Sequence, residues 1–280
     1  MYKIDSSRFI DFYFRRTALR DTAVKRPSIS PNSLDAFTAA PWPAVRRNLE
    51  VVGWLIVSTL IAVGMVSLVG RAMFLIDAHT TVNLVAEQQF DAFDIRYYQQ
   101  TIATILHLLP GFLIVVLGPL QFMPVVRKRW INFHRWSGRV YIICGITGAI
   151  SGFLIGGLNP FGGIDGAGFN EAMATWFLSL YVLYCLYKAY SSIRKRQFGA
   201  HREWMIRSFT IMIAIATERI MLGILSYTTS IELVVLFGAT FWMAGLINIV
   251  AGEIWIQLTR TPGTGARHWK DVDARAIAGG

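Results

Sequence analysis

Residues 106–141 read LHLLPGFLIVVLGPLQFMPVVRKRWINFHRWSGRVY. The first half is apolar for about 20 residues, the length of an α-helix that crosses ~30 Å of hydrocarbon. The basic turn Arg127–Arg129 follows, and a second apolar run begins soon after it. The stretch therefore predicts two membrane-spanning helices joined by a short, positively charged turn. His107 falls in the first helix and His134 at the start of the second.

Apolar runs of this length occur six times along the chain. The predicted spans are 51–75, 102–126, 139–158, 172–190, 207–227 and 233–257. The chain is 54% hydrophobic and only 16% charged, which is too few charges for a typical soluble domain. Apolar and polar residues do not alternate within the runs, which argues against a transmembrane β-barrel. The sequence predicts an all-α integral membrane protein with a six-transmembrane-helix bundle at 51–258, between tails at 1–50 and 259–280.

The 27 lysines and arginines are unevenly distributed among the loops. Nine lie in the N-terminal tail, five around the turn after the second span, six around the turn after the fourth, and four in the C-terminal tail. The exceptions are Arg71, Arg96 and Arg219. Because positive loops stay in the cytoplasm, both termini are expected to be cytoplasmic, in a multi-pass protein of the cell inner (plasma) membrane. The net charge of +10 then faces anionic lipid headgroups, and nucleic acid is not an expected partner.

Glycines recur at four-residue spacing in the third span, at Gly148, Gly152 and Gly156. This interval puts them on one helix face, where a second backbone can approach closely. Helix packing is the main interpretation. The alternative is that the face leaves room for a flat ligand.

Two similar stretches begin with histidine at the expected cytoplasmic side: His134–Arg139 (HRWSGR) and His201–Arg207 (HREWMIR). Anchoring at the membrane interface explains the tryptophans and arginines but not the histidines. A neutral imidazole ligates metals and haem iron, so His134 and His201 are candidate metal ligands that could hold one haem b between two helices. Arg135 and Arg202 would then pair with the haem propionates.

A second polar group is expected in the outer half of the membrane. His107 lies about 18 residues from the cytoplasmic end of its span, ~27 Å of helix rise, so it cannot share a ligand with His134 and His201. Glu218 and Arg219 lie at similar depth, where charges are costly and usually face partners inside a bundle. The three residues predict an outer polar site for a metal, a proton relay or a second cofactor. A purely structural Glu218–Arg219 arrangement is the alternative.

Four motifs together resemble a known family. They are His107–Gly111 (HLLPG), Gly118–Phe122 (GPLQF), Phe133–Tyr141 (FHRWSGRVY) and His201–Ser208 (HREWMIRS). The combination, from about Leu106 to Arg219, resembles the bacterial membrane family catalogued as domain of unknown function 2306. The resemblance implies a polytopic membrane protein and supplies no reaction. A histidine-bearing bundle is also remotely similar to cytochrome b561 and ferric reductase proteins, but those pair histidines at both depths, whereas His107 has no partner within a helix.

Three functions stay open at this point. The first expectation is a redox-associated protein of electron transport that binds haem b through His134 and His201. The alternative is a proton- or ion-coupled transporter that uses His107, Glu218 and Arg219. The third is a non-catalytic accessory subunit that binds a membrane protein partner or forms a homo-oligomer. Whether the protein is an enzyme is not decided by these patterns.

Overall fold

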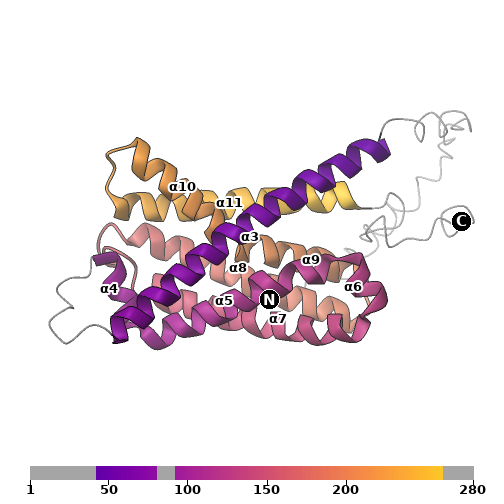
Figure 1. Cartoon of the computed structure of the whole chain (residues 1–280), viewed down its shortest axis with the longest axis horizontal. Coiled ribbons are helices and arrows are strands. Elements are labelled where there is room, and N and C mark those ends of the chain that lie inside the picture. Colours follow the sequence, from indigo (N-terminus) through magenta and orange to yellow (C-terminus); the bar gives the residue numbers. More distant parts are fainter. Residues whose placement is uncertain (1–41, 81–91, 261–280) are drawn as a thin grey trace, which may run out of the picture. The chain divides into compact units, whose positions relative to one another are not determined.

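The computed structural model describes residues 42–80 and 92–260 (Figure 1). Within these ranges six helical segments are long and apolar enough to cross a membrane. They are Arg47–Thr80, Thr101–Phe122, Ile131–Gly157, Phe169–Arg194, Phe198–Thr228 and Leu233–Thr259. The predicted all-α fold with six spans is confirmed. Of the predicted tails, 1–50 and 259–280, residues 1–41 and 261–280 lie outside the described residues, and residues 42–50 belong to the first long helix.

Helix α3, Trp42–Thr80, carries the first span. It begins before residue 51, the predicted start, because a helix can continue beyond the hydrocarbon layer into the polar interface. In the most apolar stretch of 18 residues of this helix, only 6% is buried within the chain. Apolar side chains such as Leu55 and Met73 are exposed, as expected for a surface in contact with lipid. α3 approaches the rest of the domain where its side chains are small, for example where Gly53 lies against the Trp255 ring.

Helices α5, Thr101–Phe122, and α7, Ile131–Gly152, pack along each other, and the short helix α6, Pro124–Arg129, connects them. Pro110 and Pro119 lie inside α5 without ending it. This proline-containing helix is buried on one face only. Pro110 is buried, together with Ile114, Val115 and Gly118, whereas Ile105, Leu109 and Phe112 are exposed.

The core lies between α5, α7, helix α8 (Phe169–Arg194) and helix α9 (Phe198–Met212). Tyr141 is fully buried there, and its hydroxyl lies 3.4 Å from Ser208 Oγ. Cys144 and Cys185 are both buried and free.

The fifth span is interrupted within the membrane. It consists of α9 and α10, Ala214–Thr228, with Ile213 between them at φ −91° and ψ 0°. The Ala216 N–H donates to the Ile213 carbonyl three residues back at 3.0 Å, so the turn is tighter than an α-helical turn. The third span has a second irregularity, because the π-helix η2, Phe153–Gly157, extends α7.

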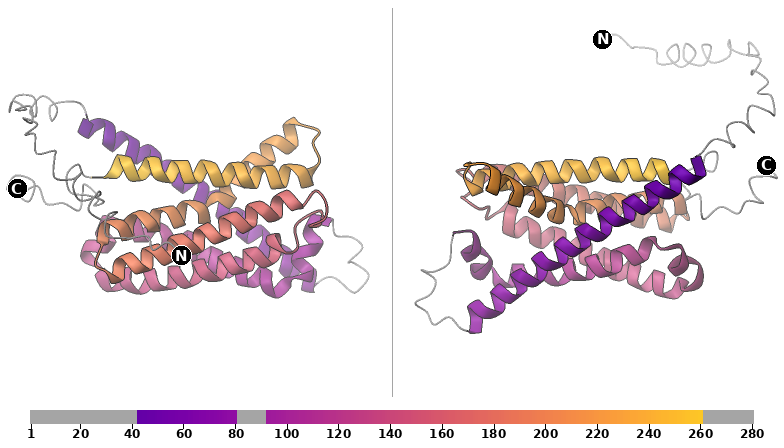
Figure 2. Two further views of the ribbon diagram at one scale, coloured as in Figure 1. Left: turned by 180° about the vertical axis from the view of Figure 1, so that it is seen from behind. Right: turned by 45° about the horizontal axis from the view of Figure 1, so that its top comes forward.

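The last helix, α11 (Leu233–Thr259), packs against α8, α9 and α10 (Figure 2). The two ends of the domain differ in the short helix that each contains. The α4 end contains α4, Ala92–Gln99, and the turn between α10 and α11, and the α6 end contains α6 and the turn between α8 and α9 (Figure 1).

Candidate functional site

A cavity of about 620 Å³ lies among the helices and opens along the half of the domain nearer the α4 end. Its wall is mostly apolar and is built by α3, α4, α5, α7, η2, α8, α9, α10 and α11. The volume is in the range of pockets that bind small molecules. All three residues of the predicted outer polar site, His107, Glu218 and Arg219, lie on this wall.

Among the described residues, the charged part of the wall contains three arginines and three carboxylates: Arg71, Arg96, Arg219, Asp94, Glu171 and Glu218. Arg96 Nη1 donates to Glu171 Oε1 at 2.8 Å, and Arg71 pairs with Asp94. Glu218 Oε2 lies 3.5 Å from Arg219 Nη1. Each acid therefore has an arginine beside it, as expected where charges lie within a membrane domain.

The Phe237 ring brings two of these arginines together. The guanidinium carbon of Arg96 lies 5.3 Å from the ring centroid, and that of Arg219 lies 5.5 Å from it. Burial alone would lower the pKa of Arg96, but Tyr97 and Glu171 raise it above its ordinary value. Arg96 is therefore a permanent positive charge in the cavity wall.

Glu171 is buried, and both of its carboxylate oxygens accept hydrogen bonds. Its Oε1 accepts from Arg96, and its Oε2 accepts from the Phe161 backbone N–H at 2.7 Å. The predicted site did not include Arg96 or Glu171. The signal that could have found them is the scarcity of basic residues on this side: the three arginines outside the basic loops, Arg71, Arg96 and Arg219, all line the cavity.

Glu218 is as buried as Glu171, with 1% of its surface exposed, but has fewer partners. Thr240 Oγ1 lies 3.3 Å from Glu218 Oε1, and Glu218 Oε2 has no hydrogen-bond partner among the described residues. Thr240 Oγ1 also lies 2.8 Å from the Leu236 carbonyl. A hydroxyl has one proton, so Thr240 can donate to Glu218 or, while donating to Leu236, accept a proton from a protonated Glu218. The contact suits either protonation state.

His107 lies on the α5 side of the cavity. Its Nδ1–H donates to the Gly148 carbonyl at 3.0 Å, and Ser151 Oγ lies 3.2 Å from the same nitrogen. These contacts join α5 to α7. Among the described residues, no hydrogen bond joins His107 to Glu218 or Arg219.

Along the glycine face of the third span, neighbouring side chains pack closely at some positions and not at others. A side chain at Gly145 would meet Leu186 and Met212, and one at Gly152 would meet the His107 ring. These two glycines allow close packing. A Cβ at Gly148 would meet nothing within 4 Å, and Gly148 lines the cavity. The face therefore packs at some positions and leaves open space at another.

Irregular backbone lies against the same cavity. Ile211–Ala216, which contain the break in the fifth span, are part of its wall, as are Ile155 and Gly156 of η2. Helix ends leave backbone groups without partners in the helix, and at membrane depth this is tolerated where the backbone is buried or lines a polar cavity. π-Helical turns occur frequently at functional sites.

The predicted haem ligands lie away from this cavity, in the first turns of α7 and α9. His201 Nδ1 donates to the Ala189 carbonyl at 2.9 Å, and His134 Nδ1 is buried without a hydrogen-bond partner among the described residues. The two imidazoles are close enough to interact electrostatically. Within residues 42–80 and 92–260, no group of three or more histidine, cysteine or acidic side chains is placed to hold a metal ion. A haem held by two histidines stays a prediction.

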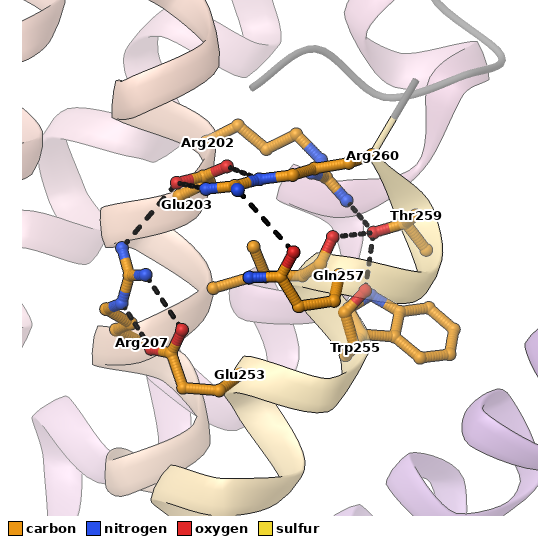
Figure 3. Close-up of polar contacts among 9 residues, drawn as sticks. Arg202, Glu203, Arg207, Glu253, Trp255, Gln257, Thr259 and Arg260 are labelled. Atoms are coloured by element: carbon orange, nitrogen blue, oxygen red, sulfur yellow. Dashed lines mark hydrogen bonds and ion pairs between the residues drawn. The ribbon is translucent and has the colours of Figure 1, made fainter. Parts of the chain in front are cut away.

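The predicted propionate partners have different surroundings. Arg135 is exposed, whereas Arg202 donates to Thr259 Oγ1 of α11 (Figure 3). The residue after Arg202, Glu203, belongs to a network of ion pairs that joins α9 to the end of α11. In this network Arg260 donates to Glu203 at 2.6 and 2.8 Å, and Arg207 donates to Glu253 at 2.5 and 2.9 Å. Arg207 of α9 thus forms an ion pair with Glu253 of α11.

One family model matches the chain, over residues 104–256, and its description is predicted membrane protein (DUF2306). The match extends beyond Arg219, the predicted limit of the resemblance, into α11. It contains α5 to α10 and so most of the cavity wall, whereas α3 and α4 lie before it. No curated protein and no solved structure matches the chain. Because the matched region is more than half of the sequence, the chain belongs to the DUF2306 family of predicted membrane proteins.

Proposed function

We propose that the protein is a proton-coupled carrier of a small solute, which binds in the cavity at the α4 end. The observation that carries the proposal is the broken fifth span. The break at Ile213 lines the cavity, and Glu218 and Arg219 follow within the next two turns of the same span. Secondary transporters typically bind substrates and coupling ions beside such discontinuous helices.

Glu218 is the proposed proton-binding group. It lies beside Arg219 and Thr240, and Glu171 and Arg96 also act on it electrostatically. The other titratable or charged groups that the described residues contribute to the cavity wall are His107, Arg71, Asp94 and Tyr97. Glu171 is held by two hydrogen bonds, whereas Glu218 Oε2 has none among the described residues, so Glu218 can change its protonation state with the smaller structural penalty.

The test is proton movement in proteoliposomes that contain a pH-sensitive dye. Carboxylates, amines, amino acids and nucleosides are added in turn to vesicles with and without the protein. At least one solute is expected to move protons only in protein-containing vesicles, and Glu218→Gln should abolish the movement. Glu232→Gln is the matched control, because Glu232 is exposed at the start of α11 and does not line the cavity. Proton movement that is unchanged in Glu218→Gln, or absent with every solute, contradicts the proposal.

The second candidate function is the redox role with haem b at His134 and His201. The observation that favours it is the hydrogen bonding of the Nδ1 atoms of His134 and His201. Metal-binding histidines usually donate their other ring N–H to a carbonyl or carboxylate, as His201 does to Ala189. The buried Nδ1 of His134 still lacks a partner among the described residues and is available as a ligand. Arg135 and Arg202 would hold the propionates, and the haem would supply one-electron chemistry.

This candidate is tested by the visible absorption spectrum of the purified protein, oxidised and then reduced with dithionite. A Soret band that is lost in His134→Ala and in His201→Ala supports it. His79→Ala is the control, because His79 lies at the end of α3 and contacts Thr101. A protein without a Soret band after expression with excess haem precursor contradicts the candidate.

A further inference from the structure

We infer that the solute is an uncharged lipophilic alcohol, whose hydroxyl binds at Glu218 and Thr175 and whose apolar body lies against α3 and α5. The inference rests on the proposed function and names its substrate class. It follows from two buried polar atoms without a hydrogen-bond partner among the described residues, from the head group that can serve both, and from the apolar wall beside them.

Thr175 supplies the first of these atoms. The residue is 6% exposed and lines the cavity, and its Oγ1 has no hydrogen-bond partner among the described residues. A threonine in a membrane helix usually donates to a carbonyl of the preceding turn or to another helix. A buried hydroxyl without a partner is uncommon, and a ligand oxygen in the cavity would supply the missing hydrogen bond.

The second atom is Glu218 Oε2. Glu218 is 1% exposed and lines the same cavity. Its Oε2 lies 3.5 Å from Arg219 Nη1, and no described residue donates a hydrogen bond to it. The other oxygen, Oε1, lies 3.3 Å from Thr240 Oγ1. A polar group of a ligand at Oε2 would therefore complete the hydrogen bonding of this carboxyl group.

Glu171 links the two atoms to one part of the cavity. A Cβ built at Gly156 would lie 3.0 Å from Thr175 Oγ1 and 3.2 Å from Glu171 Oε1, so these two oxygens are neighbours beside η2. Glu171 is in turn close enough to Glu218 for their charges to interact. The head group of the ligand is therefore assigned to this region of the wall.

The proposed proton cycle restricts the head group to one that both donates and accepts hydrogen bonds. The ionised carboxylate of Glu218 only accepts, whereas the protonated carboxyl group also donates. A hydroxyl suits both states because its O–H bond can rotate, and Thr175 can donate to it or accept from it. A carboxylate or an ether on the ligand only accepts, and an ammonium only donates, so each of these suits one state alone.

The rest of the wall favours an apolar body. Leu60 and Leu68 of α3 and Val115 of α5 line the cavity, and open space above Gly148 gives room for a ring or an alkyl chain. A short alcohol such as ethanol would leave most of the 620 Å³ unfilled, whereas a phenylalkanol would use the apolar wall. Because charges at membrane depth are costly, an uncharged head group also has the smallest desolvation penalty on entry.

Four matched probes test the head group: 4-phenylbutanol, its methyl ether, 4-phenylbutyrate and 4-phenylbutylammonium. Binding to the purified full-length protein in detergent is measured by calorimetry, with empty micelles as the blank. The alcohol is expected to bind at least about tenfold more tightly than the ether, because the ether cannot donate to the Glu218 carboxylate. Both charged probes are expected to bind more weakly than the alcohol.

Thr175→Val separates a ligand contact from a structural role. Because Thr175 Oγ1 has no partner among the described residues, its removal should not lower the free energy of unfolding, but alcohol binding should weaken about three- to tenfold. Thr259→Val is the matched control at the α6 end, since Thr259 is 1% exposed and donates to the Trp255 carbonyl at 2.6 Å. The control should lose stability and bind the alcohol normally.

Two substitutions of Glu218 test the acceptor. Glu218→Leu removes the carboxyl group and should make the alcohol and the ether bind about equally. Glu218→Gln keeps a group that donates and accepts, so most of the preference for the alcohol should remain. If Glu218→Leu does not fold, the ratio of alcohol to ether binding in the unaltered protein and in Thr175→Val still decides.

Equal or tighter binding of the ether, the carboxylate or the ammonium probe overturns the inference. So does alcohol binding that Thr175→Val leaves unchanged, or the absence of alcohol binding by folded protein, with 1-decanol tested as a longer chain. The alcohol is then added to the proteoliposome series. If it binds as expected but no solute moves protons, the binding site stands and the carrier function fails. If only another solute class moves protons through Glu218, the proposed function stands and the substrate class is wrong.

Discussion

Arg96 Nη1 lies 2.8 Å from Glu171 Oε1, and this ion pair joins α4 to the first turn of α8. Both side chains are buried, and Glu171 also accepts the Phe161 backbone N–H. The Glu171 carboxylate therefore holds both the turn before α8 and the short helix α4 at one end of the cavity. α4 precedes the region that matches the family model, yet it provides one of the fixed charges of the site.

Removing the acid from this pair should destabilise the protein strongly. Glu171→Gln leaves the Arg96 guanidinium buried without its counter-ion, and the loss of one partner of a buried pair costs about 3–5 kcal/mol. The free energy of unfolding in detergent micelles is the measurement. Replacing both partners, in Arg96→Met combined with Glu171→Leu, should recover most of the loss. A Glu171→Gln effect no larger than that of the exposed Glu232→Gln would show that the pair does not stabilise the fold.

Gly118→Ala should also be destabilising, although alanine favours helices over glycine. A Cβ at Gly118 would lie 2.7 Å from Phe209 Cδ2, so the aromatic ring would have to move within a packed core. Overpacking of this kind typically costs about 1–3 kcal/mol. Gly223→Ala is the control, because a Cβ there meets nothing within 4 Å. Equal unfolding free energies for the two variants would contradict the packing described for α5 and α9.

The six spans could be predicted because each depends on a local property, the length of an apolar run. The break at Ile213 could not, since the residues around it, Phe209 to Thr217, include no proline or glycine. α9 packs against α8 and α11, whereas α10 packs mainly against α11. The contrast between local properties and packing also explains why the sequence predicted Glu218 as a site residue but did not predict Glu171. A charge in the middle of an apolar span is visible in the sequence, whereas an acid at the start of a helix looks like an ordinary first-turn residue.

The glycine face of α7 shows what the spacing of residues cannot predict. Gly148 and Gly152 are four residues apart on one helix, yet a side chain at Gly152 would meet the His107 ring and one at Gly148 would have open space. The four-residue interval fixes the face and does not say what lies opposite. That depends on how the neighbouring helices pack, which the spacing does not specify.

Filling the open space above Gly148 should block ligand binding without unfolding the protein. Gly148→Leu places a side chain where a Cβ has no neighbours, so the free energy of unfolding should change by less than about 0.5 kcal/mol. Solute-driven proton movement in proteoliposomes should fall at least about tenfold, because the added atoms occupy the cavity. Gly223→Leu is a matched substitution at an open glycine outside the cavity wall and should leave proton movement unchanged. Unchanged proton movement by Gly148→Leu would place the solute elsewhere.

The two charged regions should respond differently to salt. In the network at the α6 end, the side chains of Glu253 and Arg260 are 40% and 39% exposed, whereas Glu171 is 2% exposed. Exposed pairs contribute only about 0–1 kcal/mol and are screened by ions. The effect of Glu253→Gln on unfolding should therefore disappear in about 1 M NaCl, and that of Glu171→Gln should persist. Loss of both effects in salt would mean that the Arg96–Glu171 pair is accessible to solvent.

The predicted orientation can be tested with single cysteines, because the two natural ones are buried packing residues. In a background with Cys144→Ala and Cys185→Ala, Glu232→Cys reports on the α4 end and Arg194→Cys on the α6 end; both positions are exposed. The basic loops gather at the α6 end, so a membrane-impermeant maleimide should label residue 232 in intact cells and residue 194 only after the membrane is opened. This result would make the cavity accessible from outside the cytoplasm, and proton uptake on Glu218 would then draw from that side. The reverse labelling pattern would turn the cavity toward the cytosol, and the carrier would export its solute from the same site.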